Sequence, residues 1–149
     1  MGNALQKRKG LFNMKKIVMP VINYMVAFLL VSASTYSVHP FLLNLAMVWF
    51  YFYLVFIVVI GLLITYLSLV YSSNVQEFKV LLSEPSGQKL NHSLSISGYN
   101  FLFRAILPFV IMGYGMFMLG YVVSANILFV MIILTYGSVY QLKQLKNSE

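Results

Sequence analysis

Residues 17–38 read IVMPVINYMVAFLLVSASTYSV, with no Lys, Arg, His, Asp or Glu among them. A helix that crosses a membrane needs about 20 mostly apolar residues, because the hydrocarbon core of a bilayer is about 30 Å thick. This stretch therefore predicts a membrane-spanning helix. The chain as a whole is 60% hydrophobic and 9% charged, whereas a soluble domain carries about 25% charged residues. A water-soluble globule is excluded.

Three further spans are predicted in the rest of the chain. The apolar run at 41–71 is longer than one upright span needs, so we place the second crossing at about 46–70 and the residues before it at the membrane surface. The mostly apolar run at 101–140 has room for two closely connected spans. Its middle holds the polar cluster at 124–126, which we take as the break. The last two spans are therefore predicted at about 101–122 and 124–142.

The positions of the cations predict how these spans are oriented. Nine of the ten Lys and Arg residues lie at 7–16, 79–89 and 143–146. Cytoplasmic flanks retain Lys and Arg, so both chain ends and the loop at 72–100 are predicted on the cytoplasmic side. Continuous apolar runs favour helices over a β-barrel. We therefore predict an all-α integral membrane four-helix bundle of the inner membrane, made of two helical hairpins, with both termini inside.

The loop at 72–100 is expected to contain a short helix. Asn74 and Glu77 are spaced as in a capping box, and apolar residues follow at helical spacing. This helix should end at 85–87, where Pro and Gly occur. It could lie on the inner leaflet or extend the second span, and the residues do not decide between the two.

A cleavable secretory signal is the alternative for the first span. Basic residues, an apolar stretch and the small residues at 31–34 follow one another as they do in such signals. Cleavage there would leave three spans. We favour an uncleaved span, because apolar residues continue past the small ones and a second span follows almost at once.

No catalytic, cofactor or metal site is predicted. The chain has no Cys and no Asp, and its three Glu residues lie outside the predicted spans. His39 and His92 are predicted on opposite faces of the membrane, so they cannot share one site. The net charge of +7 could suggest nucleic acid, but the cations flank the spans without interleaved aromatic residues. Membrane lipids are the better partner for these cations.

Four residues of the third predicted span are candidates for contacts. Gly113 and Gly120 are seven apart and would share one helix face, where the lack of side chains lets another helix approach. Pro108 adds a kink, because it removes a backbone donor. Together they predict a helix-contact surface, within the bundle or toward a partner. Arg104 could bind a lipid phosphate or another anion, or extend its side chain to the cytoplasmic interface.

Uncharged polar residues also occur inside the predicted spans. Such side chains commonly hydrogen-bond a neighbouring helix. We expect this role, in preference to a transport path, for Asn23, Tyr24, Asn44, Thr65, Tyr114 and Asn126.

In size, hydrophobicity, basic N-terminal segment and lack of catalytic groups, the chain resembles the inner-membrane entry-exclusion proteins of conjugative plasmids (TraS type). This resemblance of overall organisation implies a non-enzymatic protein that blocks redundant DNA transfer into a recipient cell by contacting another membrane protein, possibly a component of the donor transfer apparatus. It carries over no binding residue. Alternatives are a holin-like pore former that acts as a homo-oligomer, or an assembly or transport subunit of a small membrane complex.

Overall fold

The computed structural model describes residues 2–96 and 98–148, and all regular structure in these ranges is helical. The all-α prediction is thus confirmed. The elements, in chain order, are α1 (Gly2–Thr35), α2 (Pro40–Tyr71), α3 (Val75–Ser83), α4 (Gln88–Ser95), α5 (Gly98–Phe101), the π-helix η1 (Leu102–Ile106), α6 (Leu107–Met118) and α7 (Val122–Asn147).

Three of these helices are long and apolar enough to cross a membrane. They are α2, α7 and the part of α1 from Lys16 to Thr35. The segment Leu102–Met118 is a shorter apolar helix. Half of the residues of α2 are exposed although the helix is strongly apolar, so its outward face suits lipid and not water. These helices indicate a membrane protein.

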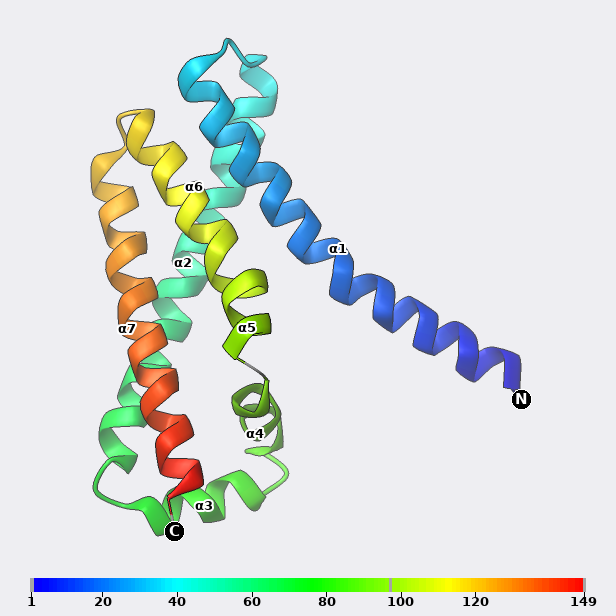
Figure 1. Cartoon of the computed structure of the whole chain (residues 1–149), viewed down its shortest axis with the longest axis vertical. Helices are drawn as coiled ribbons and strands as arrows, with labels where there is room; N and C mark the ends of the chain where they lie inside the picture. The colour runs from blue at the N-terminus through cyan, green and yellow to red at the C-terminus, as the bar shows by residue number, and fades with distance from the viewer. Residues whose placement is uncertain (1, 97, 149) are drawn as a thin grey trace.

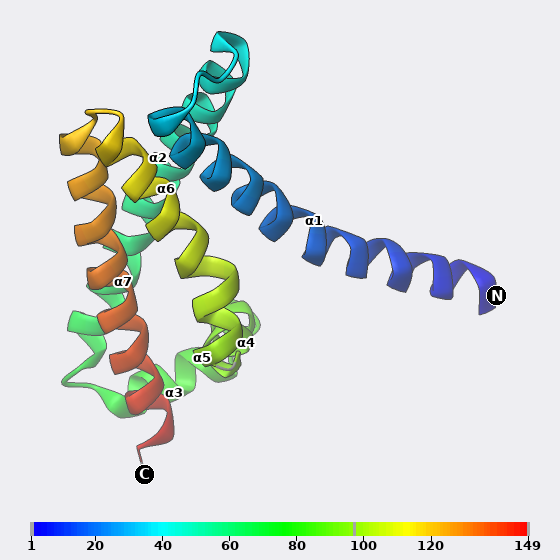
Figure 2. The ribbon, with the colours of Figure 1, turned by 45° about the horizontal axis from the view of Figure 1, so that its top comes forward.

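The long helices run side by side except for the first half of α1 (Figure 1). α7 packs on α2 and α6, and the C-terminal half of α1 packs on the same two helices. The N-terminal half of α1 leaves the bundle and extends away from it, in both views of the ribbon (Figure 2). The two connections at 36–39 and 119–121 lie at one end of the bundle, and α3, α4 and the C-terminus lie at the other.

Two apolar clusters hold these helices together. The larger one joins α1, α2, α6 and α7 through fully buried side chains that include Leu30, Phe50 and Met112. The smaller one packs α3 and α4 against the end of α7, with Phe78 and Leu142 at its centre. The short helix predicted after Asn74 is therefore present as α3. The Asn74 side chain makes no capping hydrogen bond, so burial of Phe78, and not a capping box, fixes this helix.

The α6–α7 connection differs from the prediction. We expected the break at 124–126, but these residues lie inside α7, and the turn occupies 119–121. Gly120 has a φ of +92°, a conformation that glycine adopts readily. The N–H of Gly120 donates to the Phe117 carbonyl and the N–H of Tyr121 to the Met116 carbonyl. This is the Schellman pattern that ends helices, and it outweighs the polar cluster.

The helix α2 begins at Pro40, so residues 40–45, which were expected at the membrane surface, are helical. Pro40 opens it, where the missing N–H of proline costs nothing. The Nδ1 atom of His39 accepts a hydrogen bond from the N–H of Phe41 at 3.3 Å, so His39 caps the helix. His39 is therefore a turn residue with a structural contact.

Candidate functional site

The described residues contain no group of three or more His, Cys, Asp or Glu side chains that could hold a metal ion. His39 lies before α2, at the end of the bundle with the turns, and His92 lies in α4 at the opposite end (Figure 1). The two histidines therefore do not meet. The features that can carry function are the interhelical contacts and a cavity.

Gly113 is buried in α6 and faces α7. A Cβ atom at Gly113 would lie 2.8 Å from the Phe129 ring and 3.2 Å from the Leu128 side chain. Gly113 therefore lies at a helix contact inside the protein. Gly120 does not share this face: it lies in the turn after α6, and a Cβ atom there would meet nothing within 4 Å. Gly113 and Gly120 therefore do not share one helix face as predicted, because α6 ends at Met118.

Gly115 lies against the backbone of another helix, a contact that was not predicted from the sequence. A Cβ atom at Gly115 would lie 2.9 Å from the backbone of Leu30 and of Val31 in α1. The backbones of α1 and α6 thus approach through Gly115, while Gly113 serves the contact with α7. Two glycines spaced by two residues face different neighbours on a helix, and this spacing was the available signal.

Pro108 is buried at the junction of η1 and α6. In η1 the N–H of Leu107 donates to the Leu102 carbonyl, five residues earlier. The next donor in this register would belong to Pro108, which has no N–H. The Tyr24 hydroxyl of α1 donates instead to the Phe103 carbonyl, at 2.5 Å. The effect of Pro108 is therefore a π-helical turn that is linked to α1.

Arg104 is exposed on η1. The lysines near the end of α7 hold α4 in place: the Lys143 ammonium donates to the Ile96 carbonyl at 3.0 Å, and that of Lys146 to the Ser95 hydroxyl at 2.8 Å. Cations that bind the last residues of a helix also interact favourably with its dipole. Positive charge is thus gathered on η1, α4 and α7 at the α3–α4 end of the bundle.

Polar side chains inside the long helices pair across helix contacts. The indole N–H of Trp49 donates to the Asn23 amide oxygen at 3.1 Å and joins α2 to α1. The Ser68 hydroxyl donates to the Gln141 amide oxygen at 2.7 Å and joins α2 to α7. The Thr65 hydroxyl accepts a hydrogen bond from the Ser138 hydroxyl. Three other polar residues that were expected to hydrogen-bond a neighbouring helix are exposed: Asn44, Tyr114 and Asn126.

An apolar cavity of about 340 Å³ lies between α2, α7, α4 and the rod formed by α5, η1 and α6. Among its lining residues, Tyr53 of α2 and Phe109 of α6 contact each other, with their ring centroids 5.3 Å apart. The cavity is partly open to the surroundings. Lining atoms that face empty space lack van der Waals partners on that side, so in a membrane the cavity is better filled than empty.

Thr135 lies on the wall of this cavity. Among the described residues its hydroxyl is the one buried side-chain polar atom without a hydrogen-bond partner. The same oxygen would lie 2.6 Å from a Cβ atom at Gly61, so Gly61 lets α7 approach α2 at this level.

Comparisons of the chain with protein-family models, with curated proteins and with solved structures found no match.

Proposed function

We propose that the chain crosses the inner membrane four times, with both termini and the α3–α4 segment in the cytoplasm. Besides α1, α2 and α7, the rod at 98–118 would cross the membrane, as the third crossing in chain order. At 1.5 Å per residue this rod is about 31 Å long. The charge distribution supports this, because Lys79, Lys89, Lys143 and Lys146 lie on α3, α4 and the end of α7, which share one end of the bundle.

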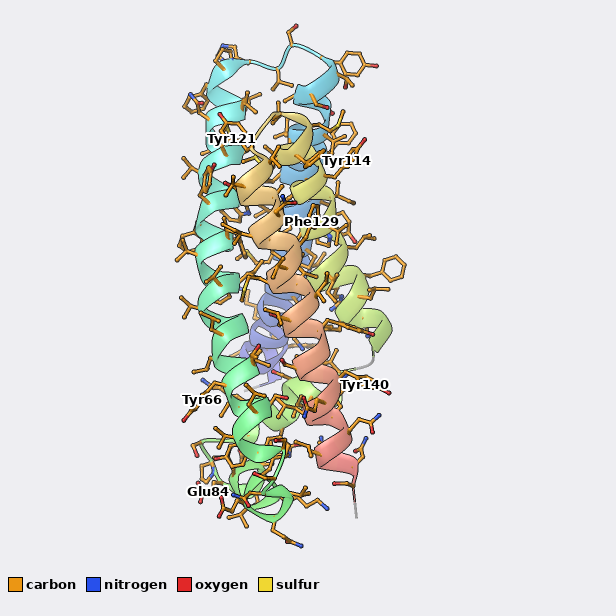
Figure 3. The ribbon with its side chains drawn as sticks, turned by 90° about the vertical axis from the view of Figure 1, so that its left-hand side faces the viewer. Tyr66, Glu84, Tyr114, Tyr121, Phe129 and Tyr140 are labelled. Carbon is orange, nitrogen blue, oxygen red and sulfur yellow. The ribbon has the colours of Figure 1, made fainter. Side chains whose placement is uncertain are left out.

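Exposed tyrosines support the same orientation. Tyr114 and Tyr121 lie toward the end with the turns, and Tyr66 and Tyr140 toward the α3–α4 end, where Glu84 also lies (Figure 3). Tyrosine is enriched at both interfaces of a membrane. The two groups fit two aromatic belts with the apolar parts of the long helices between them.

The topology can be tested with single cysteines, since the chain has none. A membrane-impermeant thiol reagent should label Ser37→Cys in spheroplasts and should label Ser86→Cys only after the membrane is opened. Both positions are exposed in connections between helices, so they are matched in accessibility. Labelling of Ser86→Cys in closed spheroplasts would refute the proposed orientation.

We further propose that the protein acts without catalysis, by contact with another membrane protein, and that its role is entry exclusion in plasmid conjugation. The observation that carries this is the use of polar groups inside the bundle. Asn23, Thr65 and Ser68 pair with neighbouring helices, and the cavity wall is apolar. A path for ions or polar solutes needs charged or polar groups along it. Contact therefore fits the described residues better than conduction.

A holin-like function would need helix surfaces that assemble into a pore. The close-packing glycines that could serve this purpose, Gly61, Gly113 and Gly115, face neighbouring helices of the same chain. The outward face of α2 is one surface that is open to a partner. Its exposed apolar side chains include Phe52, Val55, Val59, Leu62 and Leu63.

A mating assay tests this function. Recipient cells that express the protein should yield fewer transconjugants from donors with the matching transfer system, while uptake of the same plasmid by transformation should not change. The double variant Leu62→Ala, Leu63→Ala should restore transfer if the face of α2 makes the contact. Leu134→Ala, on the exposed side of α7, is a matched control and should still block transfer.

Membrane potential, measured with a voltage-sensitive dye after induction, separates the two functions. Entry exclusion predicts an unchanged potential with reduced transfer. A sudden loss of potential would support a pore former and refute the proposal. Unchanged transfer from a panel of donors with different transfer systems would refute it as well.

A further inference from the structure

The cavity between α2, α7, α4 and η1 has the shape of a site for one lipid chain. Its lining runs from Tyr53 to Ile64 along α2 and from Ile132 to Leu142 along α7. At 1.5 Å per residue, each stretch is about 15 Å long. The cavity is therefore elongated along the helix axes, which is the direction of the acyl chains in a bilayer when the helices cross it.

The width of the cavity fits the same ligand. A volume of about 340 Å³ over this length leaves a cross-section of roughly 20 Å². A single alkyl chain needs roughly 4 to 5 Å in each lateral direction, since carbon atoms in contact lie about 3.5 to 4.0 Å apart. One chain fits this space.

The cavity is partly open, and α1 leaves the bundle near its wall. The Tyr24 hydroxyl of α1 donates to the carbonyl of Phe103, which lies between the lining residues Phe101 and Ala105. The part of α1 before this contact extends away from the other helices (Figure 1 and Figure 2), and its residues Ile17, Val18 and Val21 are exposed. No described residue of α1 lines the cavity, so this side is where a lipid chain would enter.

Charge selects the kind of lipid. Arg104 is exposed on η1, next to the lining residue Ala105, and Lys143 follows the lining residue Leu142 on α7. Each lysine ammonium has three donors, so Lys143 can bind the Ile96 carbonyl and still contact an anion. Basic pockets between membrane helices on the cytoplasmic side bind anionic headgroups.

We propose that this cavity holds one acyl chain of an anionic phospholipid, with the phosphate of that lipid against Arg104 and the lysines near the end of α7. The lipid supplies the wall that α1 leaves out in this half of the bundle. It also keeps η1 and α4 in place, because its chain lies against both. This lipid site requires that the protein lies in a membrane, but it does not depend on the proposed role in plasmid conjugation.

Native mass spectrometry of the full chain, released from vesicles of equal parts phosphatidylglycerol and phosphatidylcholine in a mild detergent, tests the proposal. We expect one retained phosphatidylglycerol per chain. Ala105→Phe places a ring in the cavity and should reduce retention at least about fivefold, as overpacking does in cores. Val59→Phe adds a ring to the exposed face of α2 and should retain the lipid as the natural chain does.

Arg104→Gln leaves the cavity unchanged and keeps the proposal testable if Ala105→Phe does not fold. It should lower the preference for phosphatidylglycerol over phosphatidylcholine about fivefold, the effect of one cation near an anionic surface. Equal retention of the two lipids by the natural chain, or an unchanged amount in Ala105→Phe, would overturn the proposal. So would a disulfide that forms readily between Val18→Cys and Ala105→Cys in membranes, since α1 would then cover the opening itself.

Discussion

Gly115 allows the sharpest test of the fold, because the atoms in its way belong to the backbone of another helix. In Gly115→Ala the new Cβ atom would lie 2.9 Å from the Leu30 backbone carbon and from the Val31 nitrogen. Ordinary contacts begin at 3.4 Å. Since Leu30 and Val31 cannot rotate out of the way, α1 and α6 must move apart by about half an ångström.

The size of the effect follows from two opposing terms. Alanine is favoured over glycine inside a helix by about 0.8 to 1.0 kcal/mol. Overpacking costs about 1 to 3 kcal/mol, and contact with rigid backbone belongs to the upper part of that range. We therefore expect Gly115→Ala to lower the free energy of unfolding by about 1 to 2 kcal/mol. Gly113→Ala should cost less, because the end of the Phe129 side chain can rotate away.

Gly137→Ala is the matched control. Gly137 is exposed in α7, and a Cβ atom there would meet nothing within 4 Å. This variant should gain up to about 1 kcal/mol from helix propensity alone. The measurement is reversible unfolding of each variant in bicelles, followed by far-ultraviolet circular dichroism. If Gly115→Ala is as stable as Gly137→Ala, the close contact between α1 and α6 is not formed and the arrangement of α1 is wrong.

Three further predictions use the same unfolding measurement. Gly120→Ala should cost about 1 to 2 kcal/mol, because its φ of +92° strains any side chain; a neutral result would refute the turn. Tyr24→Phe should cost about 0.5 to 1.5 kcal/mol through the lost bond to the Phe103 carbonyl, and an unchanged stability would contradict that bond. Thr135→Val should be neutral or stabilising, since the Thr135 hydroxyl has no hydrogen-bond partner. Thr65→Val should lower the stability, because it removes the bond with Ser138. If Thr135→Val were the less stable of the two variants, the bond between Thr65 and Ser138 would be refuted.

The apolar helices could be predicted from the sequence because burial in lipid needs only length and composition. The part of α1 from Lys16 to Thr35, α2 and α7 each overlap a predicted apolar span, and α3 follows Asn74 as expected. Hydropathy averages over many residues, so a single substitution or a local irregularity hardly changes it. Pairing of Asn23 and Thr65 across helices followed from the cost of leaving polar groups unpaired in lipid.

Positions that depend on one residue's conformation could not be predicted in the same way. The polar cluster at 124–126 suggested a turn, but hydroxyl and amide groups are tolerated in the first turns of α7, whereas the positive φ of Gly120 requires the chain to leave the helix. Gly115 was missed for a related reason. Its spacing from Gly113 indicates that the two glycines lie on different sides of the helix, but which neighbour each one meets depends on how the helices are placed.

The cavity wall depends on the π-helical turn, and helical periodicity could not locate it. A π-helix closes its hydrogen bonds over five residues in place of four, so the residues after η1 face a different direction from the one that an unbroken α-helix predicts. Phe101 before this turn, Ala105 within it and Phe109 after it all line the cavity. The Tyr24 hydroxyl binds the carbonyl of Phe103 within this turn, close to the point where α1 leaves the bundle. Pro108 therefore influences both the direction of the cavity wall and the contact between η1 and α1.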